Sequence, residues 1–216
     1  MFRNRQHAGE LLAARLSAYR SQPNAIVLAL PRGGVPVAAV LARELGISLD
    51  VFPVRKLGAP SHPEYAMGAI AVNGLVVLHQ YAIASLRISQ SAIDAVIARE
   101  HEELLRQERV YRDPRPPLIL AGKNVILVDD GLATGYTMLA AIRAVREQHP
   151  VRIVVAVPLG PAETLDLLRP EADEVVCVHI PRELFAIGQF YEDFSQTTDE
   201  QVHEALRELA IGPAAR

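Results

Sequence analysis

The chain contains no tryptophan and only one cysteine among its 216 residues. The lone cysteine, Cys177, excludes a disulfide within the chain, and its apolar surroundings predict a reduced core residue. The seven histidines show no H-x-x-x-H or Cys/His spacing, which excludes the common zinc motifs. No motif of a nucleophilic serine is present either.

An excess of charge of one sign is also lacking. The 22 Lys and Arg residues nearly balance 25 Asp and Glu, and the net charge is −3. This balance argues against general nucleic-acid binding. No apolar run reaches about 18 residues, and the N-terminal residues lack an apolar signal core. We therefore expect a cytoplasmic protein without membrane or nucleic-acid partners.

Half of the residues are hydrophobic, which favours a globular chain. A chain of this length can bury a sizeable core within one domain. We therefore expect a single domain over residues 1–216.

The most informative stretch is residues 125–137, with the sequence VILVDDGLATGYT. Its four apolar residues predict a strand buried on both faces, which is typical of a parallel sheet. Asp129 and Asp130 follow at the carboxyl end of this strand, where open α/β sheets bind their ligands. A loop rich in glycine and threonine comes next, and a helix is predicted from about Tyr136.

This loop has the chemistry of a phosphate site. A helix N-terminus offers free N–H groups and the positive end of the helix dipole. Gly131 and Gly135 let the backbone curl around an anion, and the hydroxyls of Thr134 and Thr137 can add hydrogen bonds. The two aspartates can accept hydrogen bonds from hydroxyls or attract hydrated Mg²⁺. The pattern therefore favours a phosphorylated sugar.

A second anion loop is predicted near the N-terminus. Residues 25–30 indicate a strand, and Pro31-Arg32-Gly33-Gly34 leads from it into a helix over 35–45. The next strand, 50–54, is expected to end in Arg55 and Lys56. Two cations at a strand's carboxyl end suit a pyrophosphate leaving group, because they stabilise the charge that grows on it. A solvated pair after an edge strand is the alternative.

The stretch 125–137 fits neither a P-loop nor a dinucleotide fingerprint. It resembles the 5-phosphoribosyl-1-pyrophosphate (PRPP) motif of type I phosphoribosyltransferases. With the sequences LPRGGVP at 30–36, RKLG at 55–58 and GAI at 68–70, the chain is similar to a bacterial subgroup of predicted phosphoribosyltransferases. The resemblance implies an α/β fold with an open, mostly parallel sheet flanked by helices. It also implies a small hood built from about 1–20 and 180–216, and a cis peptide bond at Pro31–Arg32.

The resemblance further implies the activity. The enzyme would transfer ribose 5-phosphate from PRPP to a nitrogenous base or related acceptor and release pyrophosphate. The cofactor would be Mg²⁺, and the enzyme would act in nucleotide salvage. It would form a homodimer. The catalytic residues would be Asp129, Asp130 and Lys56, and both aspartates would also bind the metal. The residues expected to bind substrate are Arg32, Gly33, Gly34, Arg55, Gly131, Leu132, Ala133, Thr134, Gly135, Tyr136, Thr137 and Tyr191.

The segments around these motifs give further expectations. Residues 59–68 are expected to form a loop, and Asn73-Gly74 predicts a hairpin turn. The resemblance implies that a mobile loop in this region closes over the site. A long helix over 89–111 should begin at Ser89 and carry a Glu102–Arg106 pair. Thr197 and Glu200 suggest a capping box for the last helix.

The C-terminal region is rich in aromatic residues. Four of the chain's eleven Phe and Tyr residues lie in 185–194. One of these rings could stack on a planar acceptor, or the group could seal an edge of the core.

Two alternative functions are retained. The same pocket could sense PRPP or a nucleotide without catalysis. A phosphohydrolase fits less well, because no activated nucleophile is apparent. The acceptor is not identified by the sequence.

Overall fold

The computed structural model describes residues 1–112 and 115–209. Its main sheet contains five strands, which are β1 (Ala25–Ala29), β2 (Ser48–Val51), β6 (Asn124–Val128), β7 (Arg152–Leu159) and β8 (Glu174–His179). They lie in the order β2-β1-β6-β7-β8, and every neighbouring pair is parallel. The predicted open parallel sheet is confirmed.

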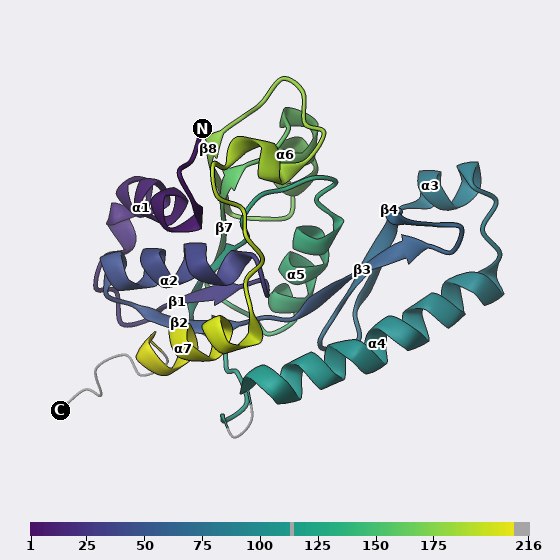
Figure 1. Ribbon diagram of the computed structural model, residues 1–216. Helices are drawn as coiled ribbons and strands as arrows, with labels where there is room; N and C mark the ends of the chain where they lie inside the picture. Colours follow the sequence, from purple (N-terminus) through teal and green to yellow (C-terminus); the bar gives the residue numbers. More distant parts are fainter. Residues whose placement is uncertain (113–114, 210–216) are drawn as a thin grey trace.

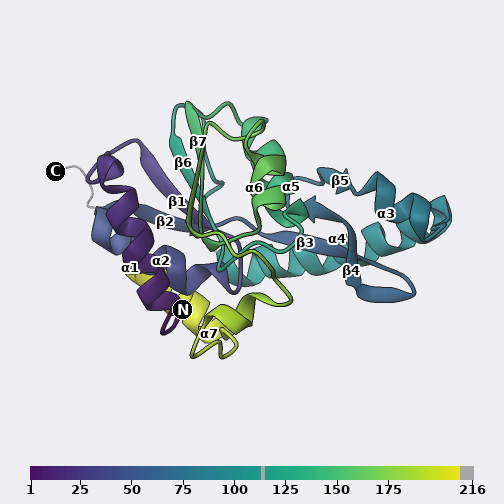
Figure 2. The same ribbon diagram turned by 90° about the horizontal axis from the view of Figure 1, so that it is seen from above.

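Helices cover both faces of this sheet (Figures 1 and 2). One face packs against α1 (Arg5–Arg15), α2 (Gly34–Leu45) and α7 (Asp199–Leu209), and the other against α5 (Tyr136–Arg146) and α6 (Ala162–Leu168). Strand β6 shows why its sequence is continuously apolar. Ile126 and Val128 enter the first core, whereas Val125 and Leu127 enter the second. None of the described helices is long and apolar enough to cross a membrane.

A second, antiparallel sheet extends away from the main one (Figure 1). It consists of β3 (Val54–Ala59), β4 (His62–Ala71) and β5 (Val76–Leu78). The turn predicted at Asn73-Gly74 is confirmed, because these residues join β4 to β5. The prediction of a loop over 59–68 is wrong, because most of these residues belong to the β3–β4 hairpin. Pro60 lies in its tight turn, and Pro63 lies where β4 pairs only with β3, so the prolines do not interrupt the sheet.

Helix α4 (Gln90–Arg112) follows the short α3 (Gln80–Ser85) and packs against this second sheet. Ser89 caps it as predicted, since its hydroxyl accepts the Ala92 N–H at 3.3 Å. The predicted Glu102–Arg106 pair is replaced by Glu103–Arg106, with an N···O distance of 2.7 Å. Residues three apart are also neighbours on a helix, so the sequence spacing allowed either pair.

The N-terminal segment meets the segment that follows β8 at the carboxyl edge of the main sheet. The Phe2 N–H donates to the Phe190 carbonyl at 2.8 Å, and the Glu192 N–H donates to the Phe2 carbonyl at 2.9 Å. Two short 3-10 helices, η1 (Ser17–Tyr19) and η2 (Ile187–Phe190), lie in the expected hood regions. Residues 210–216 of the predicted hood lie outside the described residues.

The last helix begins one residue later than the predicted capping box. Thr198 Oγ1 accepts the Gln201 N–H at 3.3 Å, and Gln201 Oε1 accepts the Thr198 N–H at 2.9 Å. The pair Thr198–Gln201 therefore replaces Thr197–Glu200.

Candidate functional site

The two predicted anion loops lie side by side. Their strands, β1 and β6, are neighbours, and Ala29 is in register with Val128. A side chain on Gly33 would overlap Asp130 Oδ2, and a Cβ on Gly34 would lie 2.7 Å from the Val128 carbonyl oxygen. Glycine is therefore required at both positions, because the first loop packs directly onto the strand end that carries the aspartates.

The first loop leads into the N-terminus of α2. Its Pro31–Arg32 peptide bond is cis, as the resemblance implies. Gly33 lies at the N-cap position of α2, so the positive end of the helix dipole faces this loop. The Gly34 N–H donates to the Leu30 carbonyl and the Val35 N–H to the Arg32 carbonyl, each at 3.1 Å, which leaves the N–H groups of Arg32 and Gly33 to face an anion. The Arg32 side chain is exposed, and its Nη1 lies 3.5 Å from Asp199 Oδ1.

The aspartate pair is held by hydrogen bonds and partly removed from solvent. Asp129 Oδ1 accepts the Asp130 N–H at 2.8 Å. Burial raises the pKa of Asp129 well above its ordinary value, and the neighbouring Asp130 carboxylate raises this pKa further. Burial also raises the pKa of Asp130, whereas the positive charge of Arg5 lowers it. This site therefore favours a cation or hydrogen-bond donor that offsets the paired charges.

Arg5 is a site residue that sequence reasoning assigned only to the hood. Its Nε and Nη2 both lie 2.8 Å from Asp130 Oδ2, and its Nη1 donates to the Ser195 carbonyl at 2.7 Å. The guanidinium carbon lies 3.9 Å from the centre of the Phe194 ring, within cation–π distance. Only its position in the N-terminal segment pointed to this role, because 125 positions separate Arg5 from Asp130.

The phosphate-type loop is anchored at both sides. Leu132 is buried and its N–H donates to the Leu159 carbonyl at 2.9 Å, while Ala133 and Thr134 are exposed. Thr164 of α6 donates its hydroxyl to the Ala133 carbonyl at 2.7 Å. Thr164 was not predicted as a site residue, because it lies 31 positions from its partner.

The two glycines of this loop and the first residues of α5 have distinct surroundings. A Cβ on Gly131 would lie 2.7 Å from Ile187. Gly135 has φ of +79° at the N-cap position of α5, and a Cβ there would lie 2.7 Å from Thr164. Tyr136 stacks on His79 with ring centres 4.5 Å apart, and Thr137 is half-buried. The loop thus presents the N-terminus of a regular helix, as a phosphate site requires.

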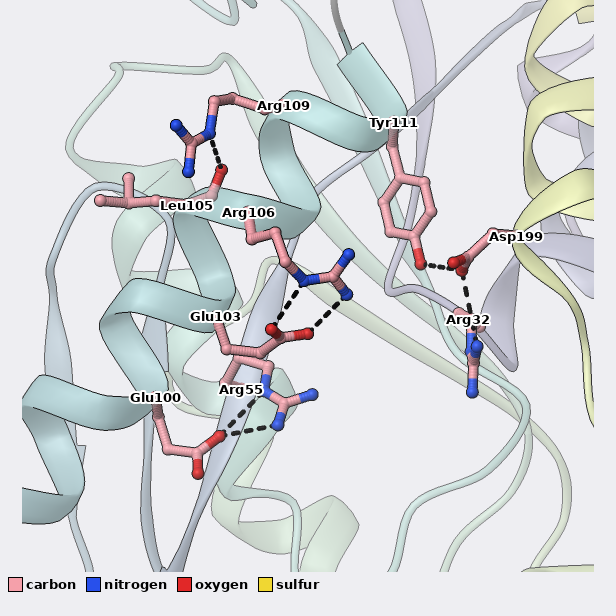
Figure 3. Close-up of polar contacts among 9 residues, drawn as sticks. All are labelled: Arg32, Arg55, Glu100, Glu103, Leu105, Arg106, Arg109, Tyr111 and Asp199. Atoms are coloured by element: carbon pink, nitrogen blue, oxygen red, sulfur yellow. Dashed lines mark hydrogen bonds and ion pairs between the residues drawn. The ribbon is translucent and has the colours of Figure 1, made fainter.

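The structure does not bring Arg55 and Lys56 to the expected strand end. Strand β2 already ends at Val51, so both cations lie inside β3 of the second sheet. Alternation along the strand directs them to opposite faces. Arg55 faces α4 and pairs with Glu100 at 2.7 Å (Figure 3), whereas Lys56 pairs with Glu64 at 3.3 Å.

The structure also separates the tail aromatics by exposure. Tyr191 is only 6% exposed, and its ring packs against Phe2 and Phe194. Its hydroxyl donates to the Asp130 backbone carbonyl at 2.7 Å, so Tyr191 supports the aspartate loop and does not present a free ring. Tyr191 therefore seals the edge of the core, and its buried ring is not placed to stack on an acceptor.

Phe185 is the exposed aromatic residue of the same segment, at 87%. It lines a cavity of about 590 Å³ together with Ile180 and Leu184. This cavity is bounded by residues that follow β7 and β8, at the edge of the sheet that carries the aspartates. Among the four predicted aromatics, Phe185 therefore offers the open ring.

The acidic residues determine which metal the site could hold. Within residues 1–112 and 115–209, no group of three or more His, Cys, Asp and Glu side chains could enclose a metal. Mg²⁺ usually binds through one or two carboxylates together with waters and substrate phosphates. Asp129 and Asp130 fit this arrangement of few carboxylates, in which the cation would bind together with a phosphorylated substrate.

Comparisons with known proteins identify the family of this chain. A family model described as a phosphoribosyl transferase domain matches residues 4–193. A Mycobacterium tuberculosis protein named "Putative phosphoribosyl transferase" is 43% identical over 202 residues, which cover 94% of this chain and 45% of that protein. The chain thus spans about half the length of the curated relatives it matches.

Solved structures support the fold. The crystal structure of TT1426 from Thermus thermophilus has 44% sequence identity and a TM-score of 0.79, covering 97% of this chain and 99% of that one. The AQ2163 protein from Aquifex aeolicus has 12% identity and a TM-score of 0.51, covering 97% of this chain and 85% of that one, and it supports the fold alone. Because the family model matches most of the sequence, the chain belongs to the phosphoribosyl transferase domain family.

Proposed function

We propose that this chain transfers ribose 5-phosphate from PRPP to a nitrogen acceptor and releases pyrophosphate. The observation that carries the proposal is the contact between the two glycine loops, where Gly33 packs against Asp130. PRPP carries a phosphate at one end and a pyrophosphate at the other. Two anion loops that flank a pair of carboxylates match the phosphate, the pyrophosphate and the ribose hydroxyls between them.

Each loop is assigned to one part of PRPP. The backbone N–H groups of 133–137 and the N-terminus of α5 would bind the 5-phosphate, because the Leu132 N–H already donates to the Leu159 carbonyl. Gly33 and Arg32 would bind pyrophosphate at the N-terminus of α2, and Gly34, whose N–H donates to the Leu30 carbonyl, would let the loop approach β6 closely. Asp129 and Asp130 lie between these sites and would accept hydrogen bonds from the ribose hydroxyls.

In this reaction, the bond from ribose C1 to the pyrophosphate oxygen breaks, and the acceptor nitrogen bonds to C1. Negative charge grows on pyrophosphate as this bond breaks, and the fixed donors of the first loop stabilise it. The carboxylates of Asp129 and Asp130 stabilise the positive charge that develops on the ribose. Mg²⁺, when bound with PRPP, would neutralise part of the phosphate charge. The catalytic role of Lys56 stays a prediction, since Lys56 lies on the hairpin and pairs with Glu64.

The acceptor would bind in the cavity beside Phe185. The exposed ring can stack on a planar heterocycle, and Arg182 and Glu183 line the same cavity with polar groups. A planar acceptor with ring nitrogens fits this combination. The homodimer, the cytoplasmic location and the role in nucleotide salvage stay predictions.

Pyrophosphate release from PRPP and Mg²⁺ tests the activity across a panel of nucleobases and small amines. The control is the variant that carries both Asp129→Asn and Asp130→Asn. Release that requires one acceptor and disappears in the control would support a transferase and name its substrate. PRPP binding without release would favour the non-catalytic sensor. The Arg5 contact makes that alternative relevant, because Arg5 already occupies one oxygen of Asp130.

A further inference from the structure

Asp199 connects the first glycine loop to two helices that lie outside it. Its Oδ1 accepts a hydrogen bond from the Tyr111 hydroxyl at 2.6 Å and faces Arg32 Nη1 at 3.5 Å. Figure 3 shows both side chains directed at this carboxylate. Tyr111 belongs to α4, Asp199 begins α7, and Arg32 belongs to the loop assigned to pyrophosphate. One carboxylate oxygen thus joins three separate parts of the chain.

The carboxylate of Asp199 is a firm anchor. Tyr111 is only 3% exposed, so the donor of the short hydrogen bond is fixed by packing. That hydrogen bond, followed by the charge of Arg32, holds the pKa of Asp199 below its usual value. The reciprocal hydrogen bonds of Thr198 and Gln201 also fix the first turn of α7, where Asp199 lies.

Arg32 keeps most of its hydrogen-bonding capacity despite this contact. A guanidinium carries five N–H donors, and the contact with Asp199 involves only Nη1. Within the part of the chain that the structure describes, no other acceptor contacts the Arg32 guanidinium. The edge formed by Nε and Nη2 therefore remains available for two parallel hydrogen bonds to a phosphate.

We propose that Asp199 is a positioning residue that orients Arg32 for pyrophosphate. This inference rests on the proposed function. Its physical basis is that a charged side chain held by a fixed carboxylate loses less conformational freedom when it binds an anion. Because Asp199 itself carries negative charge, its effect on pyrophosphate must act through Arg32 and not by direct attraction.

Calorimetric titration of the full chain with pyrophosphate and Mg²⁺ tests this role. The variants are Asp199→Asn, Arg32→Gln and their combination. Glu208→Gln is the matched control, because Glu208 is an exposed acid of the same helix that pairs with Arg43 at 2.8 Å, away from the glycine loops. Ribose 5-phosphate serves as a second probe, which reports on the loop at 131–137.

Asp199→Asn should weaken pyrophosphate binding about threefold to tenfold, the range expected for a partly exposed charged contact that orients an arginine. Ribose 5-phosphate binding should stay unchanged, and Glu208→Gln should match wild type with both probes. In the Arg32→Gln background, Asp199→Asn should have no further effect. Tyr111→Phe, which keeps the Asp199 charge, should cause a smaller loss in the same direction.

Unchanged or tighter pyrophosphate binding by Asp199→Asn would overturn the inference. An equal loss in the Arg32→Gln background would also overturn it, because Asp199 would then act without Arg32. If wild type binds neither pyrophosphate nor ribose 5-phosphate, the proposed function itself fails. That outcome is distinct from the failure of Asp199 as a positioning residue.

Discussion

Arg5 and Asp130 are 125 positions apart in the chain, yet two nitrogens of the Arg5 guanidinium lie 2.8 Å from one oxygen of Asp130. Both side chains are almost removed from solvent, at 11% and 12% exposure. The N-terminal segment is therefore part of the candidate site. It fixes one of the two aspartates and supplies the charge that offsets its burial.

Replacing Arg5 by Gln should destabilise the protein and change its pH dependence. Removing one partner of a buried ion pair leaves an uncompensated charge and costs about 3 kcal/mol in the free energy of unfolding. Because Arg5 lowers the pKa of Asp130, its loss should raise that pKa, and the acidic limb of the activity profile should move to higher pH. Urea unfolding and a pH series of initial rates measure both effects.

Arg3→Gln provides the control for this prediction. Arg3 is exposed and lies 3.6 Å from Glu10, so its loss should change the free energy of unfolding by less than about 0.5 kcal/mol. An Arg5→Gln variant with the stability and acidic limb of wild type would contradict the role of the Arg5–Asp130 pair.

Replacing Asp129 by Asn should stabilise the fold while reducing activity. The pKa of Asp129 is 3.8 in its ordinary state and is raised in the folded protein. Between these two pKa values the folded state binds more protons than the unfolded state, so the free energy of unfolding falls as the pH rises. Above that window, Asn avoids the cost of the buried charge. The melting temperature at neutral pH should rise by at least about 2 °C, the shift that roughly 1 kcal/mol gives in a chain of this size.

The pH dependence separates this effect from a general gain in packing. The gain in melting temperature should shrink as the pH falls toward 3.8, where wild-type Asp129 also becomes neutral. Turnover should fall about tenfold or more, because the variant lacks a charge that stabilises the transition state. A gain of equal size at all pH values would show that the charge of Asp129 is not its cause.

Replacing Gly33 by Ala should damage the site more than the fold. The added methyl group would overlap Asp130 Oδ2, so the loop or the aspartate must move. A misplacement of about 1 Å can cost about a hundredfold in rate, and we expect kcat/KM to fall between about tenfold and a hundredfold. Steady-state kinetics with PRPP provide the measurement.

Gly74→Ala controls for a general effect of replacing glycine. Gly74 has φ of +83° and no heavy atom within 4 Å of a built Cβ, so Ala there costs stability through backbone strain alone. This variant should lose about 1 kcal/mol of stability and keep its kcat/KM. Equal kinetics for the two variants would count against the contact between Gly33 and Asp130.

The two tail aromatics should respond in opposite ways. Phe185→Ala should leave stability nearly unchanged because the ring is exposed, but it should raise the KM for the acceptor about threefold to tenfold through the lost stacking. Tyr191→Phe should lower the free energy of unfolding by about 1–3 kcal/mol, because the buried Asp130 carbonyl loses its donor. Acceptor kinetics and urea unfolding of both variants test this contrast. A raised KM in Tyr191→Phe together with an unchanged KM in Phe185→Ala would show that Tyr191, and not Phe185, contacts the acceptor.

Local patterns explain what the sequence predicted well. The apolar run of β6 and the aspartates after it follow rules that involve only neighbouring residues. The same holds for the turn at Asn73-Gly74 and the Ser89 cap. The capping box of α7 was misplaced by one residue because Thr197 and Thr198 both precede a suitable acid or amide at the right spacing.

Other features depend on contacts between distant segments. Pro60 and Pro63 argue against a strand, so the hairpin of β3 and β4 was not predicted. Both prolines are tolerated because Pro60 lies in the turn and Pro63 lies where β4 pairs only with β3. Arg55 and Lys56 were predicted at the end of one strand over 50–54, but β2 ends at Val51 and β3 begins at Val54, and Pro53 in the sequence marks this boundary. The roles of Arg5, Thr164 and Asp199 required the folded chain, since each contacts a partner far away in sequence.

In the proposed function, the loops after β1 and β6 form one PRPP site. Calorimetric titration of the full chain with PRPP and Mg²⁺ tests it most directly, with the Asp129→Asn and Asp130→Asn double variant as the comparison. We expect one PRPP bound per chain, with affinity weakened about tenfold or more in the double variant. No binding by wild type, or equal binding by both proteins, would contradict it.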